Sequence, residues 1–247
     1  MASQPQALND FLLEATPLPT EVISIVKGKM NYKIKITSTA AAFACRLQSG
    51  TIVAWGDHKF GGNTSTVQGE LKDQIVKKIY SNGHAFAAVL GSDRVVAWGD
   101  ALYGGDISRV VQGELRNQIV ERIYSTKKAF AAVLGNDRVV TWGDADWGGN
   151  MSEAVKAELK DQVVKEIYST NHAFAAVLES GQVVTWGDVD CGGDIRAVQD
   201  ELEGQVVQHI YSTQSAFAAV LGSGRVVTWG SAEHGGSSNN ILVSSIV

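Results

Sequence analysis

The side chains that could carry proton transfer or bind a metal do not recur as a set in this sequence. Its histidines occupy four different places in the repeated pattern described below, and nothing beside them completes a Ser/His/Asp arrangement. The two cysteines, Cys45 and Cys191, also lack metal-ligand spacing with histidine. We therefore predict no enzyme, no cofactor and no metal centre. The histidines are His58, His84, His172, His209 and His234.

One carboxylate does recur, directly after each Trp-Gly pair. A circle of such carboxylates would suit a cation or a basic partner, but Asp at a turn also accepts hydrogen bonds from nearby backbone N–H groups. We favour the turn, because neighbouring copies would hold the carboxylates too far apart to share an ion. Segment 188–194 spaces its oxygens like part of a calcium loop, but it lacks the later bidentate Glu. The recurring residues are Asp57, Asp100, Asp144 and Asp188, with Ser231 in the last copy.

Two short segments vary from copy to copy and are the candidates for recognition. One holds the residue before each Gly-Gly pair: Phe60, Tyr103, Trp147, Cys191 and His234. The other holds Ala40-Ala41, Gly83-His84, Lys127-Lys128, Asn171-His172 and Gln214-Ser215. Loops carry function, and exposed aromatic rings are good binding anchors. The alternative is that the rings only cover the adjacent glycines. We expect partner contacts from Phe60, Tyr103, Lys127, Lys128, Trp147 and His172.

These residues sit in a repeat of about 43 residues. Five Trp-Gly pairs recur at intervals of 43 or 44 residues, at Trp55, Trp98, Trp142, Trp186 and Trp229. Within a unit, the runs 163–169, 173–178 and 182–188 are apolar or β-branched, with a short turn between the last two, which predicts three strands. Gly-Gly then ends the strand, the following Asn, Asp or Ser can cap a helix, and 152–162 has helical spacing.

Five such units favour a mainly β fold, a five-bladed β-propeller with about three strands and one short helix per repeat. Residues 32–247 hold the repeats. Segments 20–36 and 241–247 are apolar at the two ends, so we expect the ends to meet and close the ring. Residues 1–31 form an N-terminal extension that completes or covers a blade, and 5–15 are amphipathic. That segment either packs on the propeller or docks on a partner.

The combination of a hairpin ending in Trp-Gly, a Gly-Gly turn and a small-residue strand such as AFAAVL (173–178) resembles the repeat of the regulator of chromosome condensation family. The units look most like a compact subgroup with WGD…GGD and AFAAVL signatures. The resemblance covers all five units. It implies a propeller that works through interactions, without supplying a partner. WD-repeat propellers have a similar period, but their recurring Gly-His is missing here.

Composition limits the classes of partner that the protein could bind. The net charge of −5 argues against nucleic acid, whose binding depends on neutralising phosphates. The sequence lacks a secretory signal pattern and any apolar run that could span a membrane, so we expect a cytoplasmic protein, with export by another route left open. The leading hypothesis is a non-enzymatic propeller that binds a protein through its variable loops. A lectin-like multivalent glycan binder and a purely structural assembly module are the alternatives.

Overall fold

The computed structural model describes residues 35–237 of the chain. The predicted extension 1–31, its amphipathic segment 5–15 and the apolar end 241–247 lie outside the described residues. Among residues 35–237, no helix has the length and apolar composition needed to cross a bilayer.

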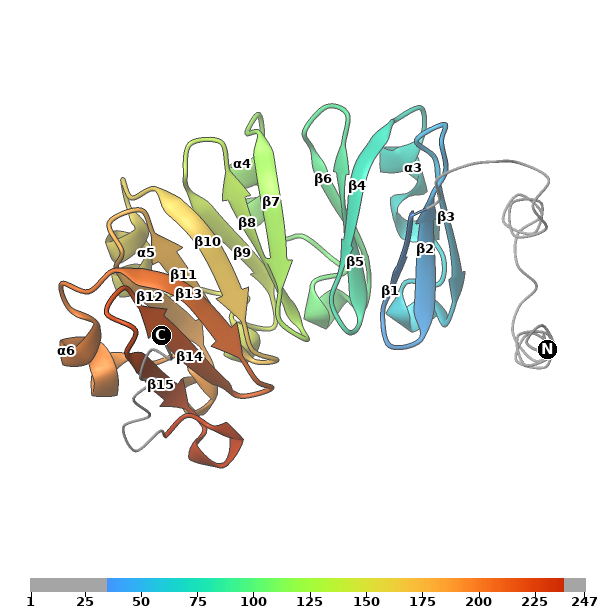
Figure 1. Ribbon diagram of the computed structural model, residues 1–247. Coiled ribbons are helices and arrows are strands. Elements are labelled where there is room, and N and C mark those ends of the chain that lie inside the picture. Colours follow the sequence, from blue (N-terminus) through green and yellow to red (C-terminus); the bar gives the residue numbers. More distant parts are fainter. Residues whose placement is uncertain (1–34, 238–247) are drawn as a thin grey trace, which may run out of the picture.

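The described chain is a five-bladed β-propeller (Figure 1). Each blade is an antiparallel sheet of three strands in chain order, as the alternation of β-branched and small apolar runs predicted. In order, the blades are β1 (Lys35–Ser38), β2 (Ala42–Arg46) and β3 (Ile52–Gly56); β4 (Val76–Ser81), β5 (Ala85–Leu90) and β6 (Val95–Gly99); β7 (Val120–Ser125), β8 (Ala129–Leu134) and β9 (Val139–Gly143); β10 (Val164–Ser169), β11 (Ala173–Leu178) and β12 (Val183–Gly187); β13 (Val207–Ser212), β14 (Ala216–Leu221) and β15 (Val226–Gly230).

Short helices connect the blades. A 3-10 turn follows every Trp-Gly: η1 (His58–Phe60), η3 (Ala101–Tyr103), η4 (Ala145–Trp147), η5 (Val189–Cys191) and η7 (Ala232–His234). The predicted helix comes next, as α4 (Arg109–Leu115) and α5 (Glu153–Leu159) in two units. In two others it is a 3-10 turn leading into one helical turn, η2 (Ser65–Val67) with α3 (Gln68–Leu71) and η6 (Arg196–Val198) with α6 (Gln199–Leu202).

The predicted helix caps need one correction. The residue after Gly-Gly does not cap the helix; Ser108 and Ser152 do, by accepting a hydrogen bond from the N–H three residues on. Asn63 and Asp194 instead accept from the N–H two residues on and close a turn before the helix. The reason is that Gly-Gly is still part of the tight turn, so the chain needs two further residues before it becomes helical.

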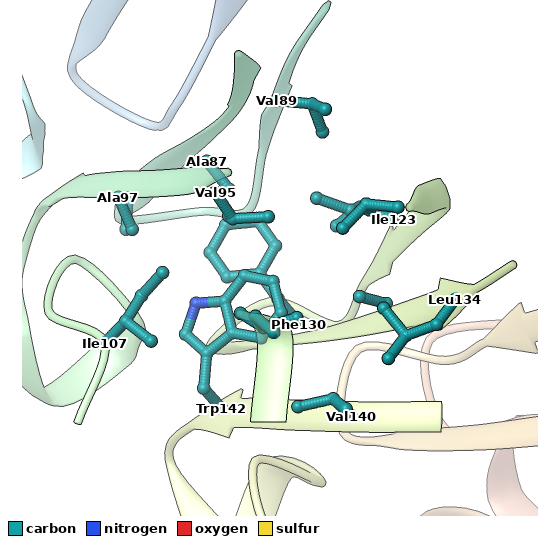
Figure 2. Packing of buried hydrophobic residues seen from close by; sticks show 14 residues of the cluster. Ala87, Val89, Val95, Ala97, Ile107, Ile123, Phe130, Leu134, Val140 and Trp142 are labelled. Carbon is teal, nitrogen blue, oxygen red and sulfur yellow. The ribbon is translucent and has the colours of Figure 1, made fainter. Parts of the chain in front are cut away.

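Successive blades are joined by one hydrophobic contact that is repeated along the chain. Between the second and third blades, Phe130 and Trp142 stack with ring centroids 5.2 Å apart. They pack against Ala87 and Val95 of the preceding blade and against Ile107 of the connecting loop (Figure 2). All of these side chains are buried. The tryptophans therefore hold successive blades together. This contact is needed because a three-stranded sheet is stable only when its apolar face packs against another surface.

The glycine after each 3-10 turn is needed for this contact. Gly104 has φ 97°, which disfavours other residues, and a Cβ placed on it would lie 2.8 Å from the Phe130 ring. The Gly-Gly pair thus allows the loop of one blade to approach the aromatic pair of the next.

The expected closure of the ring is not present within the described residues. The first and fifth blades stand at opposite ends of a curved row (Figure 1). Within 35–237, hydrophobic clusters join each blade to the next in sequence, and none joins the fifth blade to the first. Phe43 of the first blade is accordingly 46% exposed, whereas its counterpart Phe86 is 0% exposed.

Candidate functional site

The variable residue before each Gly-Gly is held in place by hydrogen bonds to its backbone. In the second blade, the Asp100 side chain accepts from Leu102 N at 3.1 Å and the Asp100 carbonyl accepts from Tyr103 N at 3.0 Å. Asn82 donates from its side chain to the Tyr103 carbonyl at 2.7 Å. The recurring aspartates are therefore turn residues, which confirms the turn interpretation. The same side-chain bond is made by Asp57, Asp144 and Asp188.

Side chains from four successive blades form one row along the edge of the propeller that carries these loops, which we call the rim. Rings from the loop before Gly-Gly alternate with a histidine or lysine from the inner loop of the next blade, the loop between its first and second strands. We call this row the rim ladder: Phe60, His84, Tyr103, Lys128, Trp147 and His172.

Close ring contacts hold the two ends of the rim ladder. The His84 ring stacks on Phe60, with centroids 5.2 Å apart, and meets Tyr103 at 4.7 Å. The His172 ring lies 3.9 Å from Trp147. Both histidines are placed by their Nδ1 atoms, which lie 3.3 and 3.4 Å from the carbonyl oxygens of Lys127 and Gln214 in the following blade. The histidines are therefore fixed from both sides.

Lys128 occupies the middle of the rim ladder. Its Nζ lies 4.5 Å from the centre of the Tyr103 ring and 4.2 Å from that of Trp147. An ammonium over two ring faces is attracted by their π electrons. The rings and Lys128 are only half-buried. The ladder thus offers a partner flat apolar faces and a positive charge in one place.

Lys127 is not part of the rim ladder, although it was predicted with it. Its backbone belongs to a chain of hydrogen bonds between inner loops, in which Gly83 N donates to Lys127 O at 3.0 Å and Lys127 N donates to Asn171 O at 2.9 Å. Adjacent residues of an extended loop point to different sides, so the exposed Lys127 lines a polar depression of about 520 Å³ instead. The depression lies among the inner loops of four blades, next to the ladder.

The ladder does not continue into the fifth blade. Cys191 of the fourth blade is equivalent to Trp147, and Ser215 of the fifth blade is equivalent to His172. Neither residue has a ring that could extend the ladder. The pKa of the Cys191 thiol is raised mainly by burial. His234 is exposed, and its Nδ1 lies 3.0 Å from the hydroxyl of Ser231, the residue that replaces the recurring Asp. The rim is therefore asymmetric.

The first strands of successive blades lie side by side and carry a polar row that the sequence did not reveal. Tyr124 donates a short hydrogen bond to Glu166, and Tyr168 bonds His209 Nδ1 at 3.1 Å. Burial, followed by the bond to Glu166, raises the pKa of Tyr124 above its usual range. One sequence signal could have indicated this polar row. The segment Ile-Tyr-Ser recurs in four blades, and the residue before it is a different charged or polar residue each time.

No metal-binding cluster accompanies these surfaces in the described part of the chain. Between residues 35 and 237, no three His, Cys, Asp or Glu side chains are grouped to hold a metal ion, including those of 188–194. A hollow of about 1050 Å³ is lined by residues of α4 and β9. Cys45 and Cys191 are both free thiols.

Comparison with known proteins identifies the fold. No protein-family model and no curated protein match the chain. Among solved structures, yeast RCC1 (Prp20) bound to Kap60 superposes with a TM-score of 0.54 at 15% identity, covering 87% of this chain and 60% of that one. Prp20p from Saccharomyces cerevisiae, a protein with binding properties toward Gsp1p and histones, gives 0.53 at 14%, covering 91% and 65%.

The entire ectodomain of the receptor kinase CR4 from Physcomitrella patens also superposes, with a TM-score of 0.53 at 16% identity, covering 85% of this chain and 54% of that one. The chain thus spans between about half and two thirds of the length of these three structures. Identities this low establish the architecture alone. The chain has a repeat propeller fold similar to that of yeast RCC1, in agreement with the resemblance noted in its repeats.

Proposed function

We propose that this protein is a non-enzymatic propeller that binds a protein partner through the rim ladder. The observation that carries the proposal is the continuous row of half-buried rings, with Lys128 among them, contributed by four blades. Burying a ring that is already fixed by its neighbours costs little side-chain entropy, which is what makes aromatic residues effective anchors. Yeast RCC1, which has this architecture, has been solved in complex with the protein Kap60.

The polar depression among the inner loops extends the proposed contact surface. Lys127 and the neighbouring Asn171 and Gln214 line it, and they add hydrogen-bonding groups beside the apolar ladder. An apolar centre with a polar rim is the usual anatomy of a protein interface. The partner segment would then lie across the rings and place polar groups toward the depression.

The asymmetry of the rim favours one protein surface over a set of repeated glycan sites. A multivalent lectin would present equivalent sites on each blade. Here the fourth and fifth blades have Cys191 and His234 at the position that holds Phe, Tyr or Trp in the first three blades. We also propose that the chain belongs to the compact WGD…GGD subgroup, that residues 32–247 form the propeller unit with 1–31 as an extension, and that it acts in the cytoplasm.

Quantitative affinity capture from the native source tests the proposal. The wild type is compared with Trp147→Ser and Lys128→Ala, and a Val110→Ala variant is the control because Val110 is exposed on α4, outside the ladder. Truncating a central anchor costs about 2 kcal/mol or more, or roughly thirty-fold in affinity. A specific partner should be recovered with the wild type and Val110→Ala and depleted with Trp147→Ser and with Lys128→Ala. Equal recovery with all four proteins would refute the rim ladder as the contact surface.

A further inference from the structure

Every interface between successive blades is the same contact with the same direction. One blade presents what we call its leading face, the stacked Phe and Trp with an Ile of its first strand. The blade before it presents its trailing face, the small Ala and Val residues of its strands together with its Gly-Gly loop. The chain contains four such interfaces in residues 35–237, so one leading face and one trailing face are left at its ends.

The leading face of the first blade is formed, and its Phe and Ile side chains are about half exposed among the described residues, whereas Cys45, on the same strand as the Phe, is buried. Phe43 and Trp55 stack with centroids 5.5 Å apart, as the equivalent pairs do in the other blades. Phe43 is 46% exposed and Ile36 is 48% exposed, whereas their counterparts Phe86 and Ile79 are buried. An exposed group of large apolar side chains marks a place where another surface binds.

On the trailing face of the fifth blade, no described residue takes the place that a Phe ring takes at the other interfaces. A Cβ placed on Gly61, Gly104, Gly148 or Gly192 would lie 2.6 to 2.8 Å from the Phe ring of the next blade. Gly235 occupies the same place in the fifth blade, and no atom of residues 35–237 lies within 4 Å of its Cβ position. Tyr211 of this face is 62% exposed, whereas its counterpart Tyr168 packs against the next blade.

The polar contacts between blades also stop at these two faces. Each later Trp donates its indole N–H to the preceding Gly-Gly loop, as Trp98 does to the Gly61 carbonyl at 3.0 Å. Within residues 35–237, the indole of Trp55 has no acceptor. The chain of inner-loop bonds ends likewise, since Asn171 N donates to Gln214 O at 2.9 Å but Gln214 N reaches no acceptor in the described part.

We propose that a second copy of this chain docks head-to-tail, with the leading face of its first blade on the trailing face of the fifth blade. Phe43 would then lie over Gly235, the Trp55 indole would donate to the Gly235 carbonyl, and Gln214 N would donate to the Ala40 carbonyl. The second copy is the occupant because it carries both halves of a contact already made four times in this chain. The two faces of a single chain stand apart, at opposite ends of the curved row (Figure 1).

Such an interface is heterologous, so each added copy leaves the same two faces free at the ends. The mass of the full-length protein, 26.3 kDa for one chain, should therefore rise with concentration in light scattering after gel filtration. Phe43→Glu blocks the leading face, and Ala218→Glu blocks the trailing face, where the equivalent Ala87, Ala131 and Ala175 are each 0% exposed. Each variant alone should remain at the mass of one chain.

A mixture of the two variants provides the decisive measurement. Each retains the face that the other lacks, so the mixture should form a dimer of twice the single-chain mass and grow no further. Ile36→Lys serves as a second leading-face variant if Phe43→Glu loses its native circular dichroism, and Leu102→Glu on an exposed loop is the control that should associate like the wild type. A wild type of single-chain mass at every concentration would overturn the proposal, since the faces would then be covered within one chain. Association that persists in both face variants would overturn it as well.

Discussion

The indole N–H of Trp142 donates a hydrogen bond to the carbonyl oxygen of Gly104 at 3.2 Å, across the interface between the second and third blades. Replacing Trp142 with Phe keeps an aromatic ring but leaves that buried carbonyl without its donor. An unsatisfied buried group costs about 1–3 kcal/mol, so the free energy of unfolding in urea should fall by at least this amount.

The equivalent substitution in the first blade is the matched control for Trp142→Phe. Trp55 stacks on its Phe in the same way, but its indole N–H has no acceptor among residues 35–237, so Trp55→Phe should cost less than Trp142→Phe in dilute protein. Equal losses would show that the hydrogen bond to the Gly-Gly loop does not contribute to stability.

The Gly-Gly loops offer a second matched pair. Gly148 has φ 88°, and a Cβ there would lie 2.7 Å from the Phe174 ring. Gly148→Ala should therefore suffer both backbone strain, about 1–3 kcal/mol, and overpacking of similar size. Gly235 has φ 96° with open space around it, so Gly235→Ala should show the strain alone. Thermal unfolding of the two variants at low concentration measures the difference, and equal melting temperatures would contradict the packing role of Gly148.

Tyr124 should make stability sensitive to alkaline pH. Burial and the bond to Glu166 raise its pKa in the folded protein above the usual 10.0. A raised pKa means that the folded state favours the neutral phenol, so the contribution to stability is complete below pH 10 and is lost as the pH rises further. Urea unfolding across this range should show a steeper loss in the wild type than in Tyr124→Phe. Parallel pH profiles would contradict this role of Tyr124.

The two free thiols should react at different stages of unfolding. Cys45 is 0% exposed in the first blade, and Cys191 is half-buried in the rim loop of the fourth. Burial raises the pKa of both thiols, so labelling of the native protein should be slow at neutral pH and faster as the pH rises. Mass spectrometry of the native protein should find one label, on Cys191, and a second only after denaturation. Labelling of Cys45 in native Cys191→Ser would contradict its burial.

Much of the fold could be predicted from the sequence because each unit repeats its local signals. The Trp-Gly interval, the small apolar strand and the Gly-Gly turn each predicted an element that the structure contains. The position of the helix cap differed by two residues, since the spacing alone does not show where the turn ends.

The candidate site was harder to predict because it forms between units. Repeat numbering aligns Tyr103 with Trp147, and Lys128 with His172, but it does not show that Lys128 lies between the two rings. That contact depends on the rotation of one blade against the next. The same rotation separates the first and fifth blades, so apolar chain ends alone could not establish whether the ring closes.

The uniform direction of the blade contacts has a consequence for how the gene can change. An additional unit of about 43 residues, duplicated in frame, would find a matching surface on each side of its insertion point, and a deleted unit would leave matching surfaces behind. The number of blades can therefore vary without any new packing having to arise by mutation. Changes in binding would then need substitutions only in the rim loops, where a copied unit can replace its aromatic residue or its lysine while the rest of the blade is unchanged.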